Sequence, residues 1–254
     1  MKRKVTYGFD APMAIRSCLL GVLVCVAIGV VSWYHVSFLW PRVRLLVISL
    51  SFFVGCSFLY AVAALMYGSV VLKVRERDWL FEELVIYGKE RVLDVGCGQG
   101  LLTVAAAKRV DTGSVVGIDI WSAEDQTNNS PETTLENARR EGVEDKIELV
   151  TGSAQQMPFE GDMFDVVISS WALHNIPSEE ERVKALTEID RVLKPGGQLA
   201  IMDIYYCEAY KKYFTEVGYQ EIMQLGPRYT FGNATHLLVA KKPRGGLGEY
   251  KYVF

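Results

Sequence analysis

The stretch Val92-Leu93-Asp94-Val95-Gly96-Cys97-Gly98-Gln99-Gly100 decides the fold of this 254-residue chain. An apolar run delivers an acidic residue, three glycines follow at alternate positions, and a second apolar run begins at Leu101. Glycines let a backbone turn tightly and approach a ligand closely. The pattern therefore predicts a buried strand, a ligand-binding turn and a helix. Because Leu101 stands where G-x-G-x-x-G needs its last glycine, and no Gly-Lys-Ser/Thr follows, neither the dinucleotide nor the phosphate-loop fingerprint is met.

The sequence on both sides of this turn alternates between strand and helix patterns. We expect strands over 91–95, 114–120, 146–151, 164–170 and 198–204, with closing strands over 219–225 and 236–242. We expect helices over 78–88, 101–110, 131–142, 179–193 and 207–217. Such alternation predicts an α/β fold: a Rossmann-like, seven-stranded, mostly parallel sheet with helices on both faces. This domain covers residues 81–242, and a tail follows over 243–254.

Further signals fall where a nucleoside-binding sheet would have them. Asp119 ends the second predicted strand, where an acid can accept both ribose hydroxyls. The segments Gly152–Phe159, Ser169–Ile176 and Arg191–Gly197 follow or precede later strands. Together with the glycine turn, these segments resemble the motifs of class I S-adenosylmethionine-dependent methyltransferases, in the small-molecule branch that includes quinone and sterol enzymes. The resemblance covers residues 91–197 well, residues 198–242 loosely and residues 1–80 not at all.

The resemblance implies S-adenosylmethionine as the cofactor. It implies that Asp94 holds the methionine amino group, directly or through water. Ser153 stands where the family has an acid that bonds the adenine amino group, so a weaker hydroxyl acceptor replaces a carboxylate. The full set of cofactor-binding residues implied in this way is Asp94, Gly96, Cys97, Gly98, Gly100, Asp119, Ile120, Ser153, Ala154 and Ser170.

Three residues are candidates for the acceptor side of the reaction. His174 can act as a general base near neutral pH, although it could instead cap the helix that follows. Asp203, at the end of the fifth predicted strand, and Tyr205 could bind an acceptor amine or hydroxyl, or Tyr205 could pack as an ordinary aromatic. The five cysteines show no metal-ligand or disulfide spacing, so no metal is expected.

Residues 1–80 differ in texture from the rest of the chain. Ser17–Pro41 and Leu45–Leu72 carry no charged residue, and each exceeds the roughly 20 residues that cross a bilayer core. We therefore predict a hairpin of two transmembrane helices, over about 17–40 and 45–72. A cleaved signal peptide, a buried soluble hairpin, and one span with a re-entrant segment are the alternatives. Small residues on both helices allow close approach and could also support a homo-oligomer.

The charge distribution bears on topology and partners. Residues 1–80 carry nine Lys/Arg and three Asp/Glu, whereas the whole chain has a net charge of −3. The positive-inside tendency places both termini and the catalytic domain in the cytoplasm. The acidic remainder excludes nucleic acid as a partner, because binding phosphates requires clustered Lys and Arg.

We therefore expect a membrane-anchored methyltransferase that acts on a small-molecule or lipid-like acceptor. Two alternatives stay open: the same enzyme acting on a soluble amine, thiol or heterocycle, with the hairpin used for assembly, and a non-catalytic cofactor-binding membrane scaffold. The segment Tyr7–Pro12 is predicted to cover the acceptor pocket, unless it is a frayed terminus. The polar stretch Trp121–Pro131 is predicted as either a lid over the cofactor or a surface loop.

Overall fold

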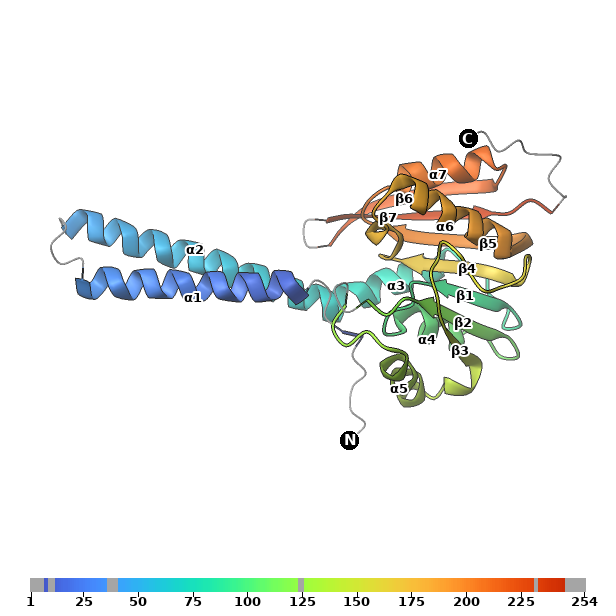
Figure 1. Cartoon of the computed structure of the whole chain (residues 1–254), viewed down its shortest axis with the longest axis horizontal. Coiled ribbons are helices and arrows are strands. Elements are labelled where there is room, and N and C mark those ends of the chain that lie inside the picture. The colour runs from blue at the N-terminus through green and yellow to red at the C-terminus, as the bar shows by residue number, and fades with distance from the viewer. Residues whose placement is uncertain (1–6, 9–11, 36–40, 123–125, 231–232, 245–254) are drawn as a thin grey trace.

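Two antiparallel helices project from one end of an α/β domain in this computed structural model (Figure 1). The structure describes residues 7–8, 12–35, 41–122, 126–230 and 233–244. Helix α1 spans Pro12–His35 and helix α2 spans Pro41–Tyr67. The predicted pair of helices is thus present, with α1 beginning earlier than expected; the turn between them, 36–40, and the tail after 244 lie outside the described residues.

Small residues bring α1 and α2 together. A Cβ atom on Gly21 would lie 2.7 Å from the ring of Phe58, and one on Gly55 would lie 3.4 Å from Cys25 Cβ. The outward side chains, in contrast, have no protein around them: Phe52 is 73% exposed and Leu20 62%. Both helices are long and apolar enough to cross a membrane, a test of length and composition that a signal sequence near the N-terminus also passes. The exposed side chains distinguish the pair from helices of a soluble core.

Helix α2 does not end where the apolar run ends. It continues through a π-helical turn, Gly68–Leu72, into α3, Lys73–Glu82. The helix predicted over 78–88 was therefore wrong at both ends. It begins as a continuation of α2, since no proline interrupts the sequence there, and it ends at Glu82, because Leu84 and Ile86 pack on the core from an irregular segment.

The sheet has seven strands in the order β3-β2-β1-β4-β5-β7-β6. The strands β1 to β5 are mutually parallel, while β7 runs antiparallel to both β5 and β6. This confirms the predicted Rossmann-like, mostly parallel sheet, although β5 begins at Leu193 rather than at residue 198 as expected. The strand bounds are β1 Arg91–Val95, β2 Ser114–Asp119, β3 Ile147–Thr151, β4 Phe164–Ser170, β5 Leu193–Asp203, β6 Gln220–Thr230 and β7 Asn233–Lys241.

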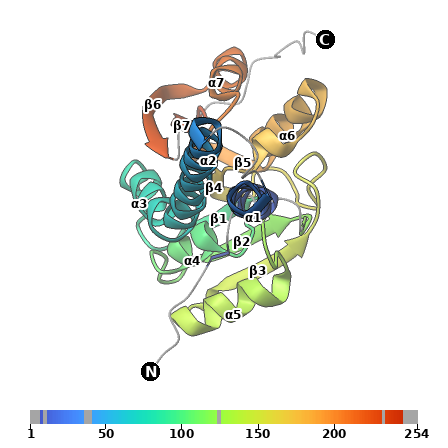
Figure 2. The ribbon, with the colours of Figure 1, turned by 90° about the vertical axis from the view of Figure 1, so that its left-hand side faces the viewer.

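Helices cover both faces of the sheet (Figure 2). One apolar cluster joins alternate side chains of the strands, such as Val92 and Ile168, to α3, α4 and α5. The other cluster joins the intervening side chains, such as Leu93 and Val167, to α6 and α7. Strands buried on both faces read as continuous apolar runs, as this sequence does. The helix bounds are α4 Leu101–Ala107, α5 Pro131–Glu141, α6 Glu179–Val192 and α7 Cys207–Glu216.

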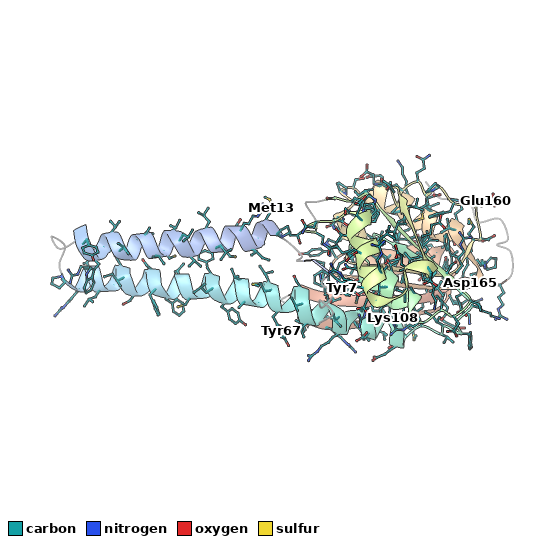
Figure 3. All side chains as sticks on the ribbon, turned by 90° about the horizontal axis from the view of Figure 1, so that it is seen from below. Tyr7, Met13, Tyr67, Lys108, Glu160 and Asp165 are labelled. Atoms are coloured by element: carbon teal, nitrogen blue, oxygen red, sulfur yellow. The ribbon has the colours of Figure 1, made fainter. Side chains whose placement is uncertain are left out.

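The carboxyl ends of the parallel strands face the helical hairpin. Asp165, in the second position of β4, and Glu160, which precedes β4, lie at the end of the domain far from the hairpin, whereas Tyr7 lies at the near end (Figure 3). Because β1, β2 and β5 run parallel to β4, their carboxyl ends lie on the near side as well. Open α/β sheets bind ligands at this edge. The ligand-binding edge of this sheet therefore faces α1 and α2.

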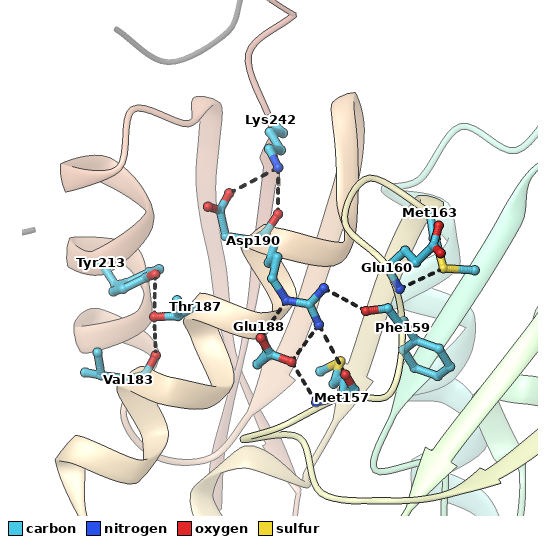
Figure 4. A network of polar contacts seen from close by, with 11 residues as sticks. Met157, Phe159, Glu160, Met163, Val183, Thr187, Glu188, Asp190, Tyr213 and Lys242 are labelled. Carbon is cyan, nitrogen blue, oxygen red and sulfur yellow. Dashed lines mark hydrogen bonds and ion pairs between the residues drawn. The ribbon is translucent and has the colours of Figure 1, made fainter. Parts of the chain in front are cut away.

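Polar clamps fasten the segments around α6 to the sheet (Figure 4). Arg191 donates to the carbonyl oxygens of Phe159 and Met157 and to the carboxylate of Glu188. The ammonium group of Lys242, nearly buried, donates to the carbonyl oxygens of Asp190 (2.6 Å) and Leu193 (2.8 Å). A buried cation held in this way stabilises the fold only while all its partners are present.

The substitution Lys242→Met should lower the free energy of unfolding by about 2–4 kcal/mol, because it removes the donor to the carbonyl oxygens of Asp190 and Leu193 and the ion pair with the Asp190 carboxylate at 3.6 Å. Thermal unfolding of purified protein measures the effect. Lys212→Met is the matched control, because this lysine is 77% exposed and its contact with Glu216 is 3.9 Å long. Equal melting temperatures for the two variants would show that the clamp contributes nothing.

Candidate functional site

The turn after β1 is built from glycines in a left-handed conformation. Gly96, Gly98 and Gly100 have φ angles of +73°, +50° and +83°, a region in which other residues are strained. A Cβ atom on Gly96 would lie 2.2 Å from the Cβ of Ala172, which follows β4. The turn is therefore fixed in shape and packed against the loop that leaves the neighbouring strand.

Asp119, predicted as the ribose-binding acid, is held at the end of β2 by three donors. Its Oδ2 accepts from the backbone N–H of Gly98 at 2.8 Å, and its Oδ1 accepts from the backbone N–H of Trp121 at 2.6 Å. The side-chain amide of Asn129 also donates to Oδ1, at 3.3 Å. The carboxylate therefore links the glycine turn to the end of the next strand, which is where a nucleoside would lie in a sheet of this kind.

Asp94 lies beneath the same turn. Its side chain is 1% exposed, and Thr103 Oγ1 on α4 donates to its Oδ2 at 2.6 Å. Burial raises the pKa of this carboxyl to about 7, and the charge of Asp119 raises it further, while the Thr103 hydroxyl opposes the shift. A cationic group bound in the turn would therefore stabilise the ionised form of the buried Asp94 carboxyl.

Cys97 can meet a ligand only through its backbone. Its side chain is buried, and its Sγ would lie 2.9 Å from a Cβ atom on Gly117 in β2. Burial raises the pKa of its thiol well above the usual range, and the charges of Asp94 and Asp119 add to the shift. The thiol is therefore kept protonated, which excludes it as a nucleophile.

The other predicted cofactor residues differ in their exposure and in their hydrogen bonds. Ile120 is largely exposed just after Asp119. Ser153 Oγ donates to the side-chain oxygen of Gln155 at 2.8 Å and accepts from the Gln155 backbone at 3.2 Å, so this hydroxyl is engaged locally. Ala154 packs against the second apolar cluster, and Ser170 is half-buried at the end of β4. The roles predicted for these residues stay predictions.

His174 and Asp203, predicted separately, form a hydrogen-bonded pair. The Nδ1 atom of His174 lies 2.5 Å from Asp203 Oδ1. The Asp203 carboxylate is fully buried and also accepts from the backbone N–H groups of His174 and Ile204 and from the hydroxyl of Tyr210. Because every other partner of this carboxylate donates, Nδ1 must donate too, which leaves His174 Nε2 as a proton acceptor. Asp203 itself does not reach the surface, so it orients His174 rather than facing an acceptor.

Aromatic side chains lie beside this pair. The ring of Tyr205, 56% exposed, meets the His174 ring edge to face at 5.9 Å between centroids. Tyr206 adopts a φ of +61°, and the guanidinium of Arg182 lies 3.7 Å from its ring centroid. The proton acceptor is therefore bordered by exposed rings that offer an apolar contact surface.

Sequence reasoning did not single out Gln99 or Gln126. Gln99 is buried within the glycine turn, and its backbone N–H donates to Gln126 Oε1 at 2.9 Å. The side-chain amide of Gln126 donates in turn to the carbonyl oxygen of Tyr7, at 3.0 Å. The one available signal was the position of Gln99 between two motif glycines; nothing in the local sequence indicates that Gln126 reaches it.

Comparison with known protein families gives a match that covers this site. Residues 93–201 match the family described as "Methyltransferase domain". Residues 93–201 therefore resemble a methyltransferase domain in sequence. The matched range contains the glycine turn, Asp119 and His174 and ends two residues before Asp203. The cofactor of the domain is S-adenosylmethionine.

Curated relatives match the same part of the chain. Methyltransferase GfsG of Streptomyces halstedii is 34% identical over 131 residues, which are 51% of this chain and 43% of that protein. Demethylmenaquinone methyltransferase of Staphylococcus aureus is 36% identical over 128 residues, which are 50% of this chain and 48% of that protein. The matched part of this chain thus spans less than half the length of these relatives.

Solved structures show the same fold. The [4+2]-cyclase SpnF matches with a TM-score of 0.56 at 20% identity, over 68% of this chain and 82% of that one. A SAM-dependent methyltransferase from Aquifex aeolicus matches with a TM-score of 0.52 at 18% identity, over 66% and 96%. Both matches leave about a third of the chain uncovered.

The residues of the glycine turn fit S-adenosylmethionine by their own chemistry. Gly98 adds no side chain to the turn, and Gln126 Oε1 lies 2.7 Å from the place of a Cβ atom there. Asp119 presents a fixed carboxylate for hydroxyl donors, and Asp94 offers a buried negative charge to an amino group. The glycine turn and these two carboxyl groups would hold the cofactor, with the backbone of Cys97 and the end of β4 completing the cradle.

Cofactor affinity should rise about tenfold per pH unit between pH 5.5 and 6.5 and level off near pH 7. Below about pH 7 Asp94 is protonated, and it must lose its proton before it can pair with the amino group of the cofactor. Calorimetry at each pH measures the affinity. Asp94→Asn should bind more weakly at pH 7 and show no such slope; an unchanged slope in this variant would exclude Asp94 as the titrating group.

Proposed function

We propose that the protein is a membrane-anchored methyltransferase that moves a methyl group to an apolar, hydroxyl-bearing small molecule at the bilayer surface. The observation that carries the proposal is the direction of the sheet. The edge with the glycine turn, Asp119 and His174 faces the two apolar helices rather than the opposite end of the domain (Figure 3). An acceptor concentrated in the bilayer would therefore meet the site directly.

The His174–Asp203 pair supports proton transfer from a hydroxyl. S-adenosylmethionine supplies a methyl group on a positively charged sulfur, which makes the methyl carbon electrophilic. His174 Nε2 would take the proton of the acceptor hydroxyl as the acceptor's electron pair bonds to the methyl carbon. The carbon–sulfur bond would break in the same step, its electron pair staying on sulfur, which would leave as a neutral thioether. Asp203 holds the ring in the required tautomer and stabilises the imidazolium that results. The remaining contribution of the protein is to hold the two reactants in line.

The surroundings of His174 support an aromatic, weakly polar acceptor. The exposed ring of Tyr205 lies next to the imidazole, and the ring of Tyr206 lies next to that of Tyr205 with Arg182 over it. Aromatic pairs gain about 0.5–1.5 kcal/mol beyond the area they bury. A ring of quinone type would suit this surface, and one of the curated relatives is named a demethylmenaquinone methyltransferase.

The two helices support anchoring by a hairpin. Their outward side chains are apolar and exposed, and the hairpin returns the chain to the side from which it began. Arg16, Arg75 and Arg77 lie at the domain end of the helices, where the positive-inside tendency favours the cytoplasm. We therefore place the domain and both helix ends connected to it on the cytoplasmic side.

His174→Gln should lower kcat by about 10²- to 10⁴-fold, the usual contribution of a general base, while the dissociation constant of S-adenosylmethionine stays within about twofold. Asp203→Asn should lower kcat in the same direction, because an amide cannot hold the imidazole in the required tautomer. Single-turnover kinetics with labelled cofactor measure both. A His174→Gln variant that keeps its turnover would show that the imidazole is structural.

The acceptor class is tested on full-length protein in lipid nanodiscs with S-adenosylmethionine carrying a tritiated methyl group. Two dihydroxy-aromatic acceptors are compared, identical except that one bears a long isoprenoid chain. We expect kcat/KM to be at least tenfold higher for the chain-bearing compound. Equal or better turnover of the chain-free compound would favour a soluble acceptor, and cofactor binding without transfer to either would favour a scaffold.

A further inference from the structure

Residues 7 and 8 lie against the cofactor turn rather than beside His174. The Tyr7 side chain is buried and belongs to the first apolar cluster, which also contains Trp79, Leu80 and Phe81 of α3. Gly8 packs on the side chain of Gln99: a Cβ atom on Gly8 would lie 2.6 Å from Gln99 Nε2. The described part of the predicted lid therefore covers the cofactor side of the site, while residues 9–11 lie outside the described residues.

Lys73 holds this segment from the other side. Its Nζ donates to the carbonyl oxygens of both Tyr7 and Gly8, each at 2.7 Å. Lys73 is the first residue of α3 and directly follows the π-helical turn Gly68–Leu72. Single π-helical turns inside α-helices occur frequently at functional sites. The ammonium group thus ties two backbone carbonyls to the helix that continues from the apolar hairpin.

Gln126 connects the same two residues to the glycine turn. Its Nε2 donates to the carbonyl oxygen of Tyr7, and its Oε1 accepts from the backbone N–H of Gln99. The same Oε1 lies 2.7 Å from the place of a Cβ atom on Gly98. Gln99 also donates to the carbonyl oxygen of Thr127. The chain of contacts runs from Lys73 through Tyr7 and Gln126 to the backbone of the turn.

We infer that Lys73, Gly8 and Gln126 are positioning residues of the cofactor site, through which the anchor helix completes the cofactor-binding turn. They act on the turn through Gln99 and touch neither reacting atom. An ammonium group on two carbonyls and a carboxamide bridge keep Gln99, and with it Gly98, in the conformation that receives the cofactor. Preorganisation of this kind strengthens binding, because the ordering is done before the ligand arrives. The inference rests on the cofactor assignment but not on the identity of the acceptor.

The test measures S-adenosylmethionine binding to the full-length protein in detergent or nanodiscs, without acceptor. Lys73→Met should raise the dissociation constant at least tenfold and increase hydrogen exchange over residues 96–101. Lys73→Arg should restore most of the affinity, because a guanidinium can also donate to both carbonyls. Gly8→Ala should weaken binding similarly, since its Cβ would collide with Gln99 and its φ of +72° disfavours a side chain. Arg75→Met is the matched control, a loss of one exposed cation two residues along the same helix.

Kinetics separate positioning from a general loss of structure. For Lys73→Met the KM for the cofactor should rise while kcat at saturating cofactor stays within about twofold and the melting temperature stays close to that of Arg75→Met. Unchanged affinity in Lys73→Met, or weaker binding in Arg75→Met to the same extent, would overturn the inference and leave the proposed function intact. Tighter binding in Lys73→Met would overturn it as well, because the segment would then obstruct the cofactor. Failure of the unmodified protein to bind S-adenosylmethionine would overturn both.

Discussion

The rest of the site depends on one constraint: a backbone that turns through left-handed conformations between β1 and α4. Gly96 sits where a Cβ atom would strike Ala172, and Gly98 donates its N–H to Asp119. These contacts bring the ends of three neighbouring strands, β2, β1 and β4, to one place. Substituting a side chain at Gly96 would separate β1 from the loop after β4, and the cofactor cradle and the acceptor side would lose their common frame.

The same turn connects the domain to the apolar helices. Helix α3 packs on the first apolar cluster while Lys73, its first residue, holds Tyr7 and Gly8 over Gln99. The two apolar helices are therefore not joined to the domain by a free linker; α2, the π-helical turn and α3 form one continuous helix. A tilt of α2 would displace Lys73, and the hydrogen bonds through Tyr7 and Gln126 would carry that displacement to Gln99. A flexible linker would instead isolate the glycine turn from the movement of α2.

The sequence predicted those parts of the site that depend on residues close together in the chain. The glycine spacing at 96–100, the acid at Asp119 and the alternation of apolar strands follow from backbone geometry and burial, so the fold and the cofactor turn could be predicted. The end of α3 was missed, because the burial of Leu84 and Ile86 against the core, not helix propensity, ends the helix. Lys73 and Tyr7 are 66 residues apart in the sequence. The spacing of apolar residues within a helix or strand cannot predict a contact between residues so far apart.

The fold alone does not decide the reaction, since a protein named a [4+2]-cyclase matches this chain as well as a methyltransferase does. What argues for transfer to a hydroxyl is the buried Asp203 under His174. A carboxylate that receives only donors fixes the imidazole tautomer, and it leaves Nε2 as the one ring atom able to take a proton. Burying a carboxylate is costly unless it is fully bonded, and Asp203 is bonded by four donors within a site whose exposed border is aromatic. The pair therefore has the geometry that the proposed general-base role of His174 requires, an imidazole with Nδ1 bonded to a carboxylate and Nε2 left to accept a proton.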